Sequence, residues 1–321
     1  MKKVAIAALT VGLVVAAWSA PASAAARTPK IFYNSDVEGP SNVYMMNTDG
    51  SQKENLSQST LRGRYFGSVS PDGTEVVMFG QTDDLDQDGG IDYALFIKKI
   101  GSPELPQMIA NDDARDKFEP RFSPTDGSKI AFIKQDPDGS KDVYVLDRNT
   151  GEQKELFDPD TVKNSLYRSV DDLDWSPDGT RLVVKSDHDS VYGELYIIDL
   201  NGNMVKPLTS NGESEYDVHW SPDGDKVSYF RRHYDAGLQK YVNDLYTVDV
   251  ASGAETKVTP GLTFGGDSAW SPDGDTLVIS GELAKTTGTA IYTIKEDGSK
   301  LTKLEDVSAT TYVAGWANVA Q

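Results

Sequence analysis

The sequence predicts an all-β protein, a six-bladed β-propeller in which every blade is a four-stranded antiparallel sheet. Three observations support this: a turn phrase that returns at a nearly constant interval, strand-like segments between its copies, and no segment with a sustained helical period. Repeats of about 50 residues are typical of propeller blades, because one such unit cannot bury both of its faces alone.

The repeated phrase is Ser-Pro-Asp-Gly or a close variant, and its five copies are spaced by 53, 53, 45 and 50 residues. Proline presets the backbone at the second turn position, and glycine can adopt the left-handed conformation that closes a hairpin. We expect the residue before each copy, which is usually aromatic, to be buried between blades, so that the phrase is architectural. The residues at this position, including a sixth start without the turn, are Val69, Phe122, Trp175, Trp220, Trp270 and Trp316.

Two sets of strand-like segments recur along with the phrase. The first set comprises 74–79, 128–133, 180–185, 225–230 and 275–280, and the second comprises 42–47, 142–147, 194–199, 244–249 and 290–295. A tyrosine recurs in the second set, and a tight turn then leads to a short polar strand such as 52–56 or 300–304. Together with the segment before the phrase, each unit has four strands, the number found in a propeller blade.

The two ends of the chain complement each other. The strand-like segments 30–35 and 42–47 have no turn phrase before them, whereas no strands follow the segment around Trp316. We therefore expect the C-terminal strand to pair with the N-terminal strands and complete a sixth blade. Such pairing removes the exposed edges of an open ring.

The first 24 residues have the pattern of a signal peptide. Lys2 and Lys3 precede an apolar run over 4–18, and small residues follow at 21–26, so we expect cleavage after Ala24. The run is shorter than the roughly 20 residues of a membrane-spanning helix, and we expect no transmembrane segment. The chain has no cysteine, which excludes disulfides and a lipid-anchored N-terminal cysteine. These features predict an exported protein, periplasmic or secreted, with residues 25–321 as a single propeller domain.

The charge balance narrows the range of partners. The chain has 31 Lys and Arg against 50 Asp and Glu, a formal net charge of −19. Nucleic acids and anionic membrane surfaces repel so acidic a protein. We expect no nucleic-acid partner, and we expect a monomer.

The two spaced motifs also carry a family resemblance. The phrase Trp-Ser-Pro-Asp-Gly and the later segment typified by 43–51 (VYMMNTDGS) resemble the TolB-type propeller repeat, which also occurs in propellers attached to prolyl-oligopeptidase-like enzymes. The resemblance covers about residues 30–317 and implies a TolB-like six-bladed propeller. TolB has an additional α/β domain before its propeller, and we expect no such domain between the leader and the first strand of this chain, so functions of that domain are not carried over.

One loop has the spacing of a calcium site. Asp84, Asp86, Asp88 and Asp92 stand at positions one, three, five and nine, with glycine at positions six and seven (Gly90). Oxygen ligands at this spacing suit a hard cation, and glycine permits the sharp bend. We expect structural Ca²⁺, with Asp84, Asp86, Asp88, Gly90 and Asp92 as the metal-site residues. The shortened relative with Asp136, Asp138 and Asp142 is expected to be an ordinary turn, although a second ion site there stays open.

Superposing the repeats gives a second group of acidic residues. Glu119, Asp172, Asp217 and Asp267 each stand three residues before the aromatic position, which places them around the mouth of the central channel, with His219 nearby. They could bind a cation or a basic partner, or they could accept hydrogen bonds from neighbouring loops.

No motif in the sequence identifies a catalytic centre. We therefore expect a non-enzymatic binding scaffold that contacts a cell-envelope or extracellular protein through its variable loops, because recognition usually resides in loops on a rigid scaffold. The alternative is a propeller enzyme (a hydrolase, lactonase or lyase) with a metal at the channel mouth.

Overall fold

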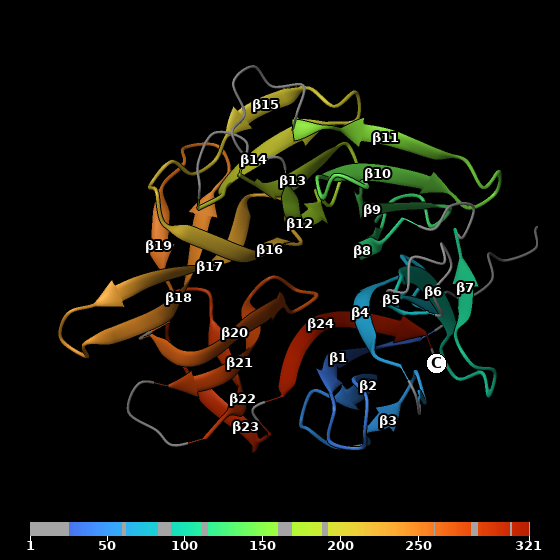
Figure 1. The fold of residues 1–321 in the computed structure, drawn as a ribbon. Helices are drawn as coiled ribbons and strands as arrows, with labels where there is room; N and C mark the ends of the chain where they lie inside the picture. Colours follow the sequence, from blue (N-terminus) through green and yellow to red (C-terminus); the bar gives the residue numbers. More distant parts are fainter. Residues whose placement is uncertain are drawn as a thin grey trace, which may run out of the picture.

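The computed structural model describes residues 26–59, 62–82, 91–110, 115–159, 169–187, 192–259, 261–283, 288–308 and 310–320. Within these ranges the regular elements are β-strands, and antiparallel sheets are arranged around a centre as an all-β propeller (Figure 1). No helix in this part of the chain is long and apolar enough to span a membrane.

Four sheets contain four strands each, and in each sheet the strands follow one another from the innermost to the outermost. The first is β24 (Thr311–Ala320), β1 (Arg27–Ser35), β2 (Asn42–Asn47) and β3 (Glu54–Asn55). The second is β4 (Arg64–Val69), β5 (Glu75–Gln81), β6 (Tyr93–Lys99) and β7 (Gln107–Ile109). The third is β8 (Lys117–Phe122), β9 (Lys129–Gln135), β10 (Lys141–Asp147) and β11 (Gln153–Phe157). The fourth is β12 (Val170–Trp175), β13 (Arg181–Ser186), β14 (Glu194–Asp199) and β15 (Met204–Pro207).

The remaining strands form one eight-stranded sheet. Its first half is β16 (Ser214–Trp220), β17 (Lys226–Asp235), β18 (Lys240–Asp249) and β19 (Glu255–Lys257), and its second half is β20 (Leu262–Trp270), β21 (Thr276–Leu283), β22 (Ala290–Lys295) and β23 (Thr302–Asp306). The halves are joined between β18 and β20 by the pair Asn243 and Leu262. Hydrogen bonding therefore does not divide the chain into the six separate sheets that the repeat predicts.

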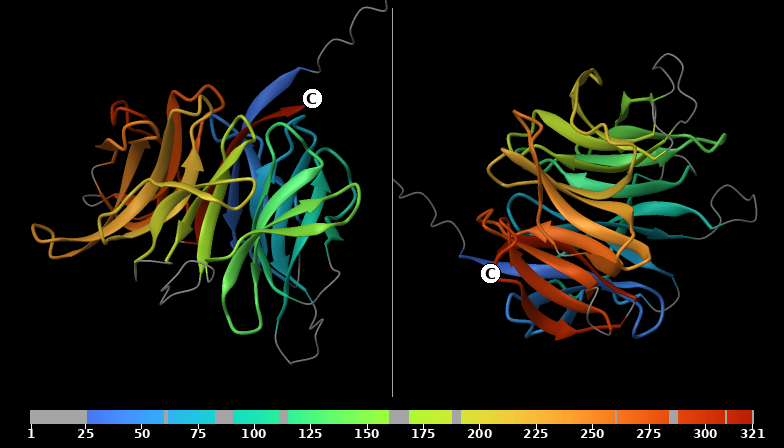
Figure 2. Two further views of the ribbon diagram at one scale, coloured as in Figure 1. Left: turned by 90° about the horizontal axis from the view of Figure 1, so that it is seen from above. Right: turned by 90° about the vertical axis from the view of Figure 1, so that its left-hand side faces the viewer.

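The expected pairing of the chain ends is confirmed. β24 lies antiparallel to β1 from the pair Arg27–Ala320 to the pair Ser35–Thr311, and Ile31 is opposite Trp316. Figure 2 shows the blue N-terminal strand and the red C-terminal strand side by side. The innermost strands β24, β4, β8, β12, β16 and β20 contact one another in succession, and β20 contacts β24.

The Ser-Pro-Asp-Gly turns have the predicted geometry. In the copy at 176–179 the Ser176 hydroxyl donates to Asp178 at 2.6 Å, and Gly179 has a φ of 69°. The expected burial of the residue before the turn is confirmed for Phe122 and for Trp175, Trp220 and Trp270, which are each 5% exposed and pack in apolar clusters. It is wrong for Val69 and Trp316, which are only partly buried. The phrase is therefore a structural device, as its chemistry predicts.

Candidate binding site at the channel mouth

Each innermost strand has an irregularity near the same end, which we call the mouth. The pairing register of the strand with its neighbour shifts between Phe66 and Ser68 in β4 and between Phe118 and Arg121 in β8. Comparable shifts occur in β12, β16, β20 and at the β1–β24 pair. Bulges of this kind redirect side chains and are common beside functional sites. In this ring they lie beside the acidic residues that the repeat alignment selected.

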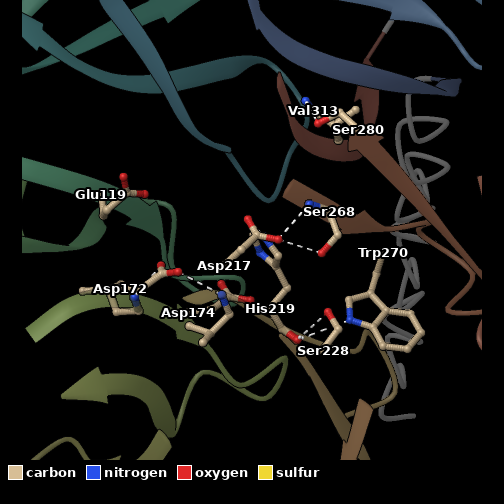
Figure 3. Close-up of polar contacts among 12 residues, drawn as sticks. Glu119, Asp172, Asp174, Asp217, His219, Ser228, Ser268, Trp270, Ser280 and Val313 are labelled. Atoms are coloured by element: carbon tan, nitrogen blue, oxygen red, sulfur yellow. Dashed lines mark hydrogen bonds and ion pairs between the residues drawn. The ribbon is translucent and has the colours of Figure 1, made fainter. Parts of the chain in front are cut away.

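Carboxylates on one innermost strand accept hydrogen bonds from the backbone of the next (Figure 3). Asp172 on β12 accepts from the Val218 amide of β16 at 2.9 Å, and Asp174 accepts from the Trp220 amide at 2.8 Å. Asp217 on β16 in turn accepts from both the amide and the hydroxyl of Ser268 on β20, at 2.7 and 2.8 Å. These three carboxylates connect successive innermost strands.

Neutral side chains connect adjacent sheets elsewhere in the ring, one from the innermost strand β4 and two from the second strands β1 and β21. Asn34 accepts from the Phe66 amide at 2.9 Å, and Ser68 accepts from the Phe122 amide at 2.7 Å. The Ser280 hydroxyl accepts from the Val313 amide at 3.0 Å. Inter-strand acceptors are thus neutral on one side of the mouth and charged on the other.

Arg121 is a buried cation beside these carboxylates, with 7% of its surface exposed. Its guanidinium donates to the Gly67 carbonyl on β4 and to Glu119, both at 3.1 Å, and lies 4.0 Å from Asp172. Glu119 itself has a φ of 47°, a left-handed conformation that is uncommon for a residue other than glycine. Arg121 therefore links β4 to β12 and partly neutralises the acidic group.

His219 is the second internal cation. Its Nε2 atom lies 3.2 Å from Asp217. Burial by itself would lower the pKa of His219, but the charges of Asp217 and Asp174 outweigh it and raise this pKa to about 9. The imidazole is therefore protonated at neutral pH.

Burial raises the pKa of three of the acids, and Asp174 is the first of them. Burial, followed by the charge of Glu119, raises the pKa of Asp172 to about 7. Burial, followed by the charge of Asp217, also raises the pKa of Asp267 well above its usual range. The raised pKa values mean that the mouth holds more carboxylates than Arg121 and His219 compensate.

The mouth encloses a cavity of about 280 Å³. The structure thus brings together the predicted residues Glu119, Asp172, Asp217, His219 and Asp267 around this cavity. The other lining residues are aromatic or small and apolar (Tyr65, Phe66, Phe79, Tyr216, Val313 and Ala314) or polar and charged (Asn34, Arg121 and Asp171). In the described part of the chain, no three His, Asp or Glu side chains are arranged to hold a metal ion.

Most of the predicted calcium loop, namely Asp84, Asp86, Asp88 and Gly90, lies outside the described residues. Asp92 is described: it is 6% exposed, and its carbonyl accepts from the Thr82 amide at 2.8 Å. In the shortened loop, Asp136 pairs with Arg115, and Asp138 accepts from the amide and hydroxyl of Ser140 at 3.1 and 2.7 Å.

The sequence alignment overlooked Arg121 and Asp174. Both stand directly before the aromatic position, where His219 also stands. Because side chains two residues apart share one face of a strand, this position points to the same side as the position three before the aromatic residue. Comparing the repeats at both positions would have found them.

Comparison with known proteins places this fold. The family model "TolB beta propeller domain" matches residues 92–318. The chain belongs to the TolB beta propeller domain family. It is 28% identical over 131 residues to the protein Atu1656 of Agrobacterium fabrum, and this match covers 41% of the chain. It is 27% identical over 220 residues to the peptidase YuxL of Bacillus subtilis, and this match covers 57% of the chain. The chain spans 42% and 32% of the lengths of these relatives.

A solved structure agrees with the assignment. TolB from Acinetobacter baumannii aligns with a TM-score of 0.67 at 18% identity, over 90% of this chain and 66% of that one. At this identity the likeness concerns the TolB-like fold.

The ion pair between Asp217 and His219 gives the first prediction. In Asp217→Asn the pKa of His219 should fall well below 9, because the largest contribution that raises it is removed. The ring protons of His219, followed by NMR across about pH 5–10, measure this value. The exposed Asp225→Asn variant, in the same repeat, is the matched control and should leave the pKa unchanged.

The same pair predicts a pH dependence of stability. A histidine with a raised folded pKa stabilises fully below its unfolded value of about 6.5, and this stabilisation is lost as pH rises through about 9. The contribution of this pair to the free energy of unfolding should therefore decline between about pH 7 and 9 in the wild type, and decline less in Asp217→Asn. An unchanged His219 pKa in that variant would contradict this assignment of charges.

Proposed function

We propose that this protein is an exported, non-enzymatic binding module whose channel mouth takes a cationic side chain of a protein partner. The observation that carries the proposal is the distribution of hydrogen bonds at the mouth. The carboxylates of Asp172, Asp174 and Asp217 accept hydrogen bonds from backbone amides of the next innermost strand. Glu119 and Asp267 accept instead from side chains, those of Arg121 and Ser280, and Glu119 keeps 29% of its own side chain exposed.

A ligand cation would relieve the electrostatic imbalance of the mouth. Arg121 and His219 face more acids than they can neutralise, and the raised pKa values of Asp172 and Asp267 follow from burial and this excess of negative charge. A guanidinium or ammonium group between Glu119 and Asp267 would stabilise their ionised forms. Tyr65, Phe79 and Tyr216 around it offer ring faces and edges to the apolar stem of such a side chain.

We also propose that the ring has six blades. The contacts of six innermost strands in succession support this number, as does the single residue pair that joins the two halves of the eight-stranded sheet. Each half begins with an innermost strand that ends in a tryptophan, Trp220 or Trp270. The halves β16–β19 and β20–β23 then count as separate blades.

The binding prediction uses a peptide with a neutral isostere. Acetyl-Gly-Arg-Gly-amide should bind about tenfold more tightly than its citrulline counterpart, because only the guanidinium is charged. The affinity should rise as pH increases from about 6 to 8. The carboxyl of Asp172 loses its proton around pH 7, and the pKa of Asp267 is also raised above the usual range of an aspartate, so the mouth becomes more negative over this interval. Isothermal titration calorimetry measures both effects.

The controls separate the mouth from general surface charge. Combining Glu119→Gln with Asp267→Asn should abolish the preference for arginine over citrulline. Asp275→Asn removes an acid whose side chain is 75% exposed and should preserve the preference. Equal affinity of the two peptides for the wild type would refute the proposed cation site.

Catalysis is the second candidate, because buried groups with raised pKa values are also typical of active sites. Mass spectrometry of the same peptide after incubation distinguishes the two functions. Intact peptide is the result expected of a binding module. Cleavage that disappears in Asp172→Asn would establish an enzyme instead.

We propose further that Ca²⁺ binds the loop of Asp84, Asp86, Asp88, Gly90 and Asp92, on the strength of its spacing. Chelation by EDTA should lower the melting temperature of the wild type, because carboxylates held together without a cation repel each other. Asp86→Ala should remove this sensitivity. Asp138→Ala, in the shortened loop, should retain it, and a wild type that is insensitive to EDTA would refute the calcium site.

A further inference from the structure

The end of the sheets opposite the mouth contains a series of equivalent contacts. At this end the aromatic residue of an innermost strand packs against the preceding sheet. The guanidinium carbon of Arg181, the first residue of β13, lies 5.2 Å from the ring centre of Trp220 on the next innermost strand. Arg181 thus covers the ring that follows its own sheet.

Lys129 occupies the equivalent position before Trp175. It is the first residue of β9, and it pairs in register with Asp147 as Arg181 pairs with Asp199. The Lys129 ammonium, however, donates to Asp126 at 2.9 Å and is thereby held within its own turn. Arg181 lies farther from the acid of its own turn, 4.0 Å from Asp178, and the shorter Lys129 side chain borders a space beside Trp175.

This space is a cavity of about 240 Å³ between the third and fourth sheets, which we call the Trp175 pocket. Its walls are Val145, Leu156, Trp175 and Leu200, and Leu200 is 38% exposed. The indole N–H of Trp175 already donates to the Arg121 carbonyl at 3.1 Å, so the tryptophan offers the pocket an apolar surface.

Four charged residues also line the pocket, and their charges balance. Lys129 and Lys154 stand against Asp147 and Glu152. The pocket therefore favours neither a cationic nor an anionic ligand, in contrast to the acidic mouth. The chemistry that fits is an uncharged, apolar group.

We propose that the Trp175 pocket is a second binding site, separate from the mouth, that takes one small uncharged aromatic ring. A closed apolar cavity of about 150 Å³ suffices to hold benzene in another protein, so the Trp175 pocket has room for a single substituted ring. Such a ring would pack against Leu156 and Leu200 and meet Trp175 edge to face or offset.

The test uses toluene as the probe and acetamide as a polar molecule of comparable size. The Trp175 indole N–H resonance, assigned by its loss in Trp175→Phe, should shift saturably with toluene, with a dissociation constant on the order of 1 mM. Acetamide should not shift it. No saturable shift with toluene would overturn the proposal.

Two variants change the cations at the two equivalent positions, which lie beside tryptophans that are equally buried, each 5% exposed. Lys129→Arg supplies a guanidinium that can lie over Trp175, and it should weaken toluene binding at least about tenfold. Arg181→Ala uncovers Trp220 and should add a second site of similar affinity. Wild-type affinity in Lys129→Arg, with an unchanged melting temperature, would show that toluene binds elsewhere and would also overturn the proposal.

Discussion

The ring depends on satisfying the backbone at the inner edges of its sheets. An innermost strand pairs with its own sheet on one side only, and its other edge faces the axis and the next sheet. Buried amides at that edge need hydrogen-bond acceptors, and each amide left without one costs about 1–3 kcal/mol. Side chains of the preceding sheet supply these partners: Asn34, Ser68, Asp172, Asp174, Asp217 and Ser280.

This constraint also accounts for the electrostatics of the mouth. Where the acceptor is Asn or Ser, the connection between sheets adds no charge. Where it is Asp, a buried negative charge is added, and Arg121 and His219 compensate for part of it. The binding function that we propose uses the negative charge that is left uncompensated, chiefly that of Glu119 and Asp267. The same group of carboxylates thus fastens the innermost strands and forms the proposed cation site.

The repeat made most of the fold predictable. The turn chemistry of Ser-Pro-Asp-Gly, the strand segments and the pairing of β24 with β1 all followed from local rules read at a fixed interval. The roles of Asp172 and Asp217 were harder to predict, because a carboxylate near an axis suits a ligand and a backbone amide equally well. Only the positions of the Val218 and Ser268 amides show that both acids serve the ring. The Trp175 pocket was also beyond prediction, since it depends on the direction of one lysine side chain.

Native-state hydrogen exchange tests the central claim most directly. If carboxylates fasten the inner edges, the amides of Val218, Trp220 and Ser268 should exchange only by global unfolding, with the same protection free energy as sheet-centre amides such as that of Val183. Exchange of these amides by a local opening, much faster than that of Val183, would contradict the account.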